Sequence, residues 1–128
     1  MNNSYFRIAL SRARAVLGNK GRLLTLVVQL IGKLNTSNIS SEYWKGRLFL
    51  TGRLIKAFAT GKYRDISIKS ILLLIAAVIY FINPLDLIPD AVIGFGFTDD
   101  LAILTGVYSL VSGELEKFQE WEFSIYKS

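Results

Sequence analysis

The chain has 128 residues, which suits one domain whose core is large enough to fold without disulfide bonds or metal ions. It contains no Cys and no His, which excludes disulfide bonds, thiolate metal sites and a histidine base, and leaves a Ser or Thr nucleophile without its usual imidazole partner. The formal charge of +5 is divided unevenly, because residues 1–69 carry +11 and residues 70–128 carry −6. Such an asymmetry indicates contact with a membrane surface, contact with a nucleic acid, or attraction between the two halves of the chain.

The first two predicted helices combine basic and apolar residues. Ser4 is expected to cap a first helix that runs to about Leu17, with its apolar residues on one face and with Arg7 and Arg14 opposite. Residues 18–19 (Gly-Asn) end that helix. Residues 22–34 form the next helix and place apolar side chains on nearly every side. Such a helix is either buried or in contact with lipid.

A third helix is expected to begin at Ser40 or Ser41 and to end near Gly61, after a polar linker rich in Asn and Ser. Two interpretations of its basic side stay open. It is either the solvated face of a bundle helix or the side that meets the headgroups of anionic lipids. With the two arginines of the first helix, the candidates for contact with a lipid surface are Arg7, Arg14, Lys45, Arg53 and Lys56.

The fourth predicted helix, residues 66–82, contains a run of twelve uncharged residues at 71–82. A membrane span needs about 20 mainly apolar residues, whereas a run of twelve extends only about 18 Å. The helix can therefore span a membrane marginally, enter it and return, or lie buried in a core. Asn83 and Pro84 end it, because proline disfavours helical backbone angles in the residue before it.

The last helix is predicted over residues 99–113, with Asp99 and Asp100 at its positive N-terminal end, and residues 114–128 form an acidic tail with aromatic residues. The whole chain is thus predicted to be a single all-α domain of about five helices. Basic amphipathic helices occupy residues 1–60. An apolar helical hairpin occupies residues 61–113, its helices joined by a reversal rich in Pro, Asp and Gly.

The reversal and its flanks carry the most specific motif of the chain: Tyr80, Pro84, Asp86, Leu87, Ile88, Pro89, Asp90, Gly96, Asp99 and Asp100. An apolar helix ending in Tyr, then Pro, a D-L-I-P-D core, a Gly and a D-D pair resembles the YkvA-like family, the domain of unknown function 1232. The resemblance covers about residues 61–104. This chain departs from the family at Ile93, where another proline is usual. What the resemblance implies is a small helical protein, often a membrane protein, with no established reaction.

Four aspartates near the reversal allow two interpretations. Asp86, Asp90, Asp99 and Asp100 supply the oxygen ligands that Mg²⁺ or Ca²⁺ prefers, if the reversal brings them together. Aspartates also cap helix N-termini and stabilise turns, and these four lie where the chain changes direction. We expect the structural role, with no cofactor, and we assign no catalytic residue.

Apolar residues make up 52% of the chain and its mean hydropathy is +0.39, both high for a soluble domain. The leading hypothesis is therefore a small membrane-associated helical protein that acts by binding lipids or another membrane protein and is not an enzyme. Its basic N-terminal half is expected on the cytoplasmic side. The alternatives are a divalent-metal-dependent, hydrolase-like site built from the aspartates and a soluble helical interaction module. We expect no nucleic-acid binding, because no recognisable motif accompanies the basic residues.

Overall fold

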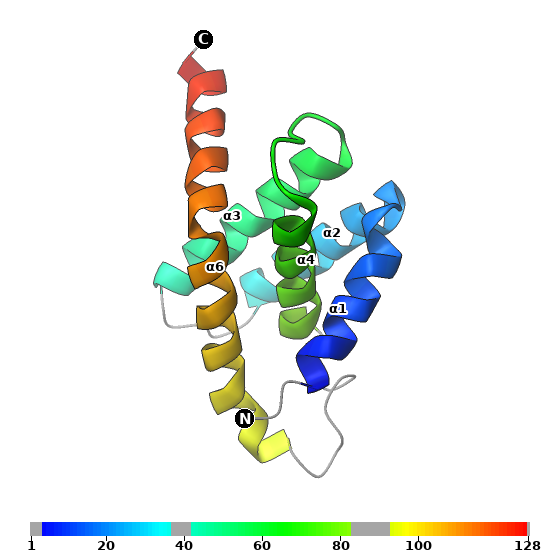
Figure 1. Cartoon of the computed structure of the whole chain (residues 1–128). Helices are drawn as coiled ribbons and strands as arrows, with labels where there is room; N and C mark the ends of the chain where they lie inside the picture. Colours follow the sequence, from blue (N-terminus) through cyan, green and yellow to red (C-terminus); the bar gives the residue numbers. More distant parts are fainter. Residues whose placement is uncertain (1–3, 37–41, 83–92, 128) are drawn as a thin grey trace.

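The computed structural model describes the backbone of residues 4–36, 42–82 and 93–127, and the side chains of residues 7–35, 42–82 and 105–125. Within these ranges all regular structure is helical, as predicted for an all-α fold (Figure 1). The helices are α1 (Ser4–Leu17), α2 (Lys20–Thr36), α3 (Glu42–Ala59), α4 (Ile68–Ile82) and α6 (Ile93–Lys127).

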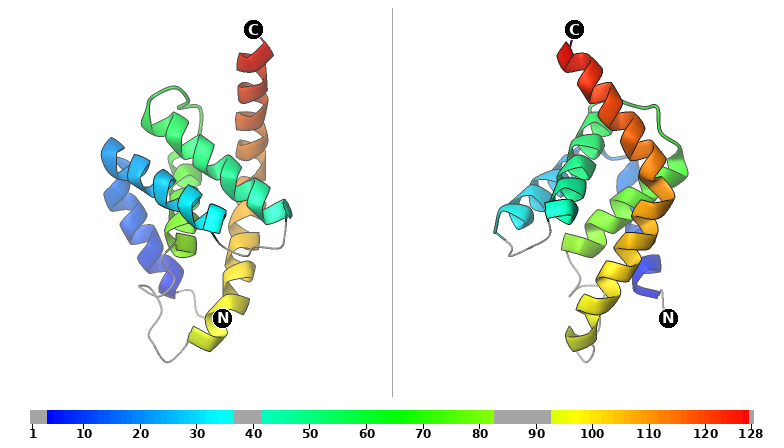
Figure 2. Two further views of the ribbon diagram at one scale, coloured as in Figure 1. Left: turned by 180° about the vertical axis from the view of Figure 1, so that it is seen from behind. Right: turned by 90° about the vertical axis from the view of Figure 1, so that its left-hand side faces the viewer.

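Helix α4 is the centre of the bundle and contacts α1, α2, α3 and α6. Seen from behind, α2 and α3 cross in front of α4, while α6 lies on its other side (Figure 2). Eight of the fifteen residues of α4 are buried, at positions 71 and 74–80. The structure therefore places this helix in the core of the bundle. No helix in the described part of the chain combines the length and the apolar character that crossing a membrane requires.

The N-terminal helices follow their predicted faces, with one correction. In α1, Ala9, Ala13 and Val16 are buried, and both arginine candidates are exposed. Helix α2 was expected to carry apolar side chains on nearly every side and to be either buried or in contact with lipid. It buries one face only, and Val28 on the other face is 69% exposed. Full burial of α2 is therefore excluded, although the helix contacts α1, α3 and α4, and contact of its exposed face with lipid stays a prediction.

Short polar contacts explain where α2 and α4 begin. Asn19 caps α2, because its side-chain oxygen accepts a hydrogen bond of 3.1 Å from the Arg22 N–H, so that helix starts two residues earlier than predicted. Ser67 caps α4 in the same way, accepting a bond of 3.2 Å from the Ser70 N–H. Helix α4 therefore starts at Ile68, two residues later than predicted.

Helix α6 is longer at both ends than the predicted 99–113. Its 35 residues extend about 52 Å, and residues 114–127 continue the helix. The reason is a buried stripe at helical spacing that does not stop at Gly113: Val107, Tyr108, Val111, Leu115 and Phe118. The helix runs antiparallel to α4, which confirms the hairpin, and its C-terminal turns project beyond the other helices (Figure 1).

Two glycines of α3 give a matched test of helix packing. A Cβ atom at Gly52 would lie 3.3 Å from Leu30 Cδ2 of α2, whereas nothing lies within 4 Å of a Cβ atom at Gly46. We expect Gly52→Val to lower the free energy of unfolding by about 1–3 kcal/mol, since the added methyl groups overpack this contact. Gly46→Val is expected to change it by less than about 0.5 kcal/mol. Denaturant unfolding of both variants measures the difference, and equal losses would contradict the close approach of α2 and α3.

Candidate functional site

The predicted motif lies mostly outside the described residues. Tyr80 is described and is buried, at 1% exposure, near the end of α4. Its neighbours Pro84, Asp86, Leu87, Ile88, Pro89 and Asp90 fall within residues 83–92, outside the described residues. Gly96, Asp99 and Asp100 belong to the first turns of α6, where only the backbone is described. Both interpretations of the four aspartates, the structural role that we expect and the metal site, thus stay untested. The described side chains contain no group of three acidic residues placed to hold an ion.

The helix end that leads into the motif is held by α2. Lys33 Nζ lies 2.6 Å from the Phe81 carbonyl oxygen and 3.4 Å from that of Ile82, and 4.9 Å from the centroid of the Phe81 ring. A lysine at this position satisfies carbonyl groups that have no partner inside the helix and stabilises the negative end of its dipole. Sequence reasoning missed this role, because the two partners are 48 residues apart.

The five candidates for a lipid surface divide between two helices. Arg7 and Arg14 lie exposed on α1, which packs against α4 and α2. Lys45 is half-buried on α3. Arg53 and Lys56, also on α3, are exposed and line the same hollow between α3 and α6. The structure therefore brings two of the five candidates together at one site.

We call this hollow the α3–α6 groove. It has a volume of about 310 Å³, near the lower limit for small-ligand sites. Three cations, a threonine and one carboxylate surround an apolar floor, and the complete lining is Arg53, Lys56, Ala57, Thr60, Lys62, Phe118, Trp121, Glu122 and Ile125. The groove thus combines positive charge with apolar surface.

The chain reversal after α3 places Lys62 at this groove. Gly61 has a φ of 79°, which a residue with a side chain rarely adopts, and its N–H donates to the Phe58 carbonyl oxygen at 3.1 Å. The Lys62 N–H donates to the Ala57 carbonyl oxygen at 2.9 Å. These two bonds form a Schellman motif, which ends α3 and turns the following residues back over its last turn.

The floor of the groove rests on a cluster of three aromatic rings. Tyr63 lies 5.0 Å from Phe118 and 5.0 Å from Trp121, measured between ring centroids, and Phe118 stacks on Trp121 at 5.5 Å. Burial raises the pKa of the Tyr63 phenol, whose oxygen has no hydrogen-bond partner among the described residues. The cluster therefore fixes Trp121, which is half-buried, at the edge of the core.

Two polar contacts hold α3 and α6 together. Thr51 Oγ1 and Tyr108 Oη form a buried hydrogen bond of 2.6 Å, and burial raises the pKa of Tyr108 to about 12. This tyrosine is accordingly a neutral structural group at ordinary pH. Nearer the surface, Arg53 Nε donates to Glu122 Oε2 at 2.8 Å. Arg53, at the edge of the groove, is thus already paired with a carboxylate.

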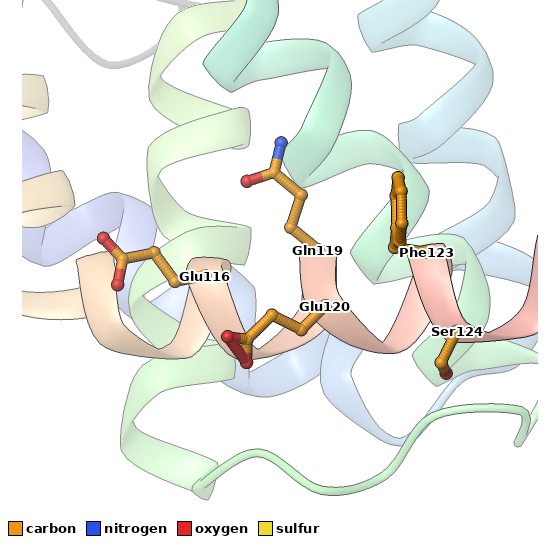
Figure 3. A pocket seen from close by; sticks show the side chains of 5 residues that line it. All are labelled: Glu116, Gln119, Glu120, Phe123 and Ser124. Carbon is orange, nitrogen blue, oxygen red and sulfur yellow. The ribbon is translucent and has the colours of Figure 1, made fainter. Parts of the chain in front are cut away.

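A second hollow, on the acidic side of α6, has different chemistry. It is lined by Glu116, Gln119, Glu120, Phe123 and Ser124, and Figure 3 shows that all five side chains come from this one helix. Although its volume of about 550 Å³ is larger, a single helix face cannot enclose a ligand. The α3–α6 groove has walls from two helices, which makes it a better candidate for a binding site than this single-helix hollow.

Comparison with known proteins finds a family that matches the central part of the chain. Residues 70–106 match the family described as "Protein of unknown function (DUF1232)". The uncharacterized membrane protein YkvA of Bacillus subtilis (strain 168) is 38% identical over 69 residues, which are 54% of this chain and 65% of that protein, a little under two thirds of its length. The central part of the chain is therefore similar to the DUF1232 family. This confirms the resemblance found in the sequence.

The DUF1232 segment contains most of α4, residues 83–92 and the first turns of α6. The α3–α6 groove lies outside it, because its lining residues come from positions 53–62 and 118–125. No solved structure matches the chain.

Proposed function

We propose that this protein is a membrane-associated helical protein that binds the surface of anionic bilayers through the cations of its N-terminal half. One observation carries the proposal. Ten of the thirteen Lys and Arg residues in positions 1–69 are exposed, and among them only Arg53 forms an ion pair with a described residue. The positive charge of this half is therefore directed outward and is available to anionic lipid headgroups, each cation near such a surface contributing about 1 kcal/mol.

The similarity to YkvA supports the same proposal, since that relative is named a membrane protein. Peripheral binding of this kind requires exposed cations and some apolar surface, and it needs no helix that crosses the bilayer. Exposed apolar side chains do occur on the helices of the basic half, at Ile8, Val28, Ile31 and Tyr43. Because anionic lipids are enriched in the cytoplasmic leaflet, we assign the protein to the cytoplasmic face.

Flotation with lipid vesicles tests the proposal. The protein is expected to float with vesicles that contain phosphatidylglycerol and to stay behind with vesicles of phosphatidylcholine alone. High salt should release it, because ions screen interactions between exposed charges. The double variant Arg7→Ser/Arg14→Ser should bind anionic vesicles at least about tenfold more weakly, at about 1 kcal/mol for each cation. Equal flotation with both kinds of vesicle would overturn the proposal.

A further inference from the structure

We infer that the α3–α6 groove binds one anionic phospholipid, with the phosphate between Lys56 and Lys62 and the first part of an acyl chain against Trp121 and Ile125. This inference deepens the proposed function and rests on it for the source of the ligand, which is the bilayer that the basic half contacts. The site is lined by the last turns of α3 and by residues 118–125 of α6, the helix whose C-terminal turns project beyond the other helices (Figure 1).

The charges at the rim fit a phosphate. Three cations and one carboxylate line the groove, and the carboxylate of Glu122 is bonded to Arg53. Lys56 and Lys62 are both exposed, and neither forms an ion pair with a described residue. A lysine ammonium group binds phosphate as a point charge without demanding one fixed geometry. The ammonium groups of Lys56 and Lys62 are therefore both available to bind an anion.

The floor fits the apolar part of a lipid. Ala57 and Phe118 are buried beneath the groove, Trp121 is half-buried, and Ile125 is 49% exposed at its open end. A tryptophan with one covered face and one accessible edge is typical of the boundary between headgroups and acyl chains. A volume of about 310 Å³ accommodates a headgroup phosphate and a short length of chain rather than a whole phospholipid. The rest of the lipid would stay in the bilayer.

Binding can be measured at the site itself. The chain has two tryptophans, so a Trp44→Phe background leaves Trp121 as the only tryptophan. The probe is dihexanoyl phosphatidylglycerol, used as monomers below its micelle concentration. We expect a saturable change in Trp121 fluorescence. Lys56→Ser/Lys62→Ser should weaken this binding by about tenfold or more, whereas Arg7→Ser/Arg14→Ser, with the same change in charge, should leave the affinity within about twofold.

Further binding measurements distinguish a phospholipid from other anions as the ligand. Inorganic phosphate and glycerol phosphate, which lack acyl chains, are expected to bind at least about tenfold more weakly than the short-chain lipid. The inference would be overturned if these ions bound as tightly as the short-chain lipid, or if a polyglutamate peptide competed with the lipid as well as the lipid itself does. In either case the groove would recognise negative charge alone. Circular dichroism checks that the lysine variants keep their helix content, as expected for two exposed side chains.

The vesicle and monomer measurements fail in distinguishable ways. If both double variants lose the same affinity for anionic vesicles and the short-chain lipid gives no saturable signal, the bilayer proposal stands and the groove inference is wrong. If vesicles do not bind while the short-chain lipid binds and Lys56→Ser/Lys62→Ser removes it, the groove inference stands and the bilayer proposal is wrong. Vesicle binding together with site-specific loss at the two lysines supports both.

Discussion

Replacing Ile75 by Ala is expected to lower the free energy of unfolding by about 2–5 kcal/mol. Ile75 is 0% exposed and lies in the middle of α4, the helix that contacts every other described helix. Removing its side chain deletes apolar contacts and leaves a cavity that a close-packed bundle fills only in part. Denaturant unfolding of the purified protein measures the loss as a lower midpoint at an unchanged slope.

Ile68→Ala provides the matched control on the same helix. Ile68 is 58% exposed in the first turn of α4, so the same substitution should change stability by less than about 0.5 kcal/mol. Similar losses at the two positions would contradict the central position of α4. That result would mean that both faces of the helix are covered, for example by lipid or by a second copy of the chain. The pair therefore tests whether this apolar segment is the core of the protein.

Apolar periodicity was sufficient to predict most of the fold. The stripe of Ala9, Ala13 and Val16 defines the buried face of α1, and the helix in the structure, Ser4–Leu17, ends where it was predicted to end and includes the residue predicted to cap it. The uncharged run at 71–82 predicted an apolar helix that forms the first half of a hairpin, and α4 confirms it. Such patterns are reliable because a helix in a small bundle must turn one continuous stripe toward the core.

Helix ends depended on contacts that periodicity does not contain. The last helix was predicted to run to about Gly113 or beyond, and Leu115 and Phe118 extend its buried stripe well past that residue. Their burial depends on α3 and on Tyr63, which are distant in sequence. Local propensity at a single glycine, about 1 kcal/mol, is small compared with the burial of two large side chains.

The candidate groove could be predicted only in part. Arg53 and Lys56 stood out as cations on an amphipathic helix, and the structure places both at the rim. Lys62 and Trp121 were not predicted as site residues. Lys62 reaches the groove through the reversal at Gly61, and Trp121 through the fold of α6 against α3. A tryptophan among the acidic residues of the C-terminal segment was the one available signal, and it did not identify its partner helix.

A carboxylate on α6 supplies the final prediction. Glu114 Oε2 accepts a hydrogen bond of 3.0 Å from the Ser67 N–H, at the residue that caps α4. In a capping box this acceptor comes from the third residue of the same helix, where α4 has Ser70. Glu114 therefore supplies, from α6, the carboxylate acceptor that a capping box would place in α4 itself. The same bond joins α4 and α6 at the end of the hairpin opposite to residues 83–92.

Glu114→Ala is expected to lower the free energy of unfolding by about 1.5–3 kcal/mol near neutral pH, the range for a hydrogen bond to a charged group. The matched control is Glu116→Ala on the same helix. Glu116 is exposed and forms no hydrogen bond or ion pair with a described residue, so its removal should cost less than about 0.5 kcal/mol. A loss at position 116 equal to that at position 114 would show that helix propensity or net charge, and not the cap, is responsible.

The contribution of Glu114 also has a defined pH dependence. The hydrogen bond from the Ser67 N–H lowers the pKa of this carboxyl below its ordinary value of 4.5, burial opposes the shift, and Lys117, whose ammonium lies 3.4 Å away, adds to it. A lowered pKa in the folded state means that the unfolded chain binds more protons in this range, so stability falls as the pH falls.

The difference in stability between the wild type and Glu114→Gln should be complete above pH 4.5. It should disappear as the pH falls through 4.5 and then through the lower pKa of the folded protein. Thermal unfolding of both proteins across this range measures it. A difference that persists in strong acid would show that the glutamate acts through packing and not through its charge.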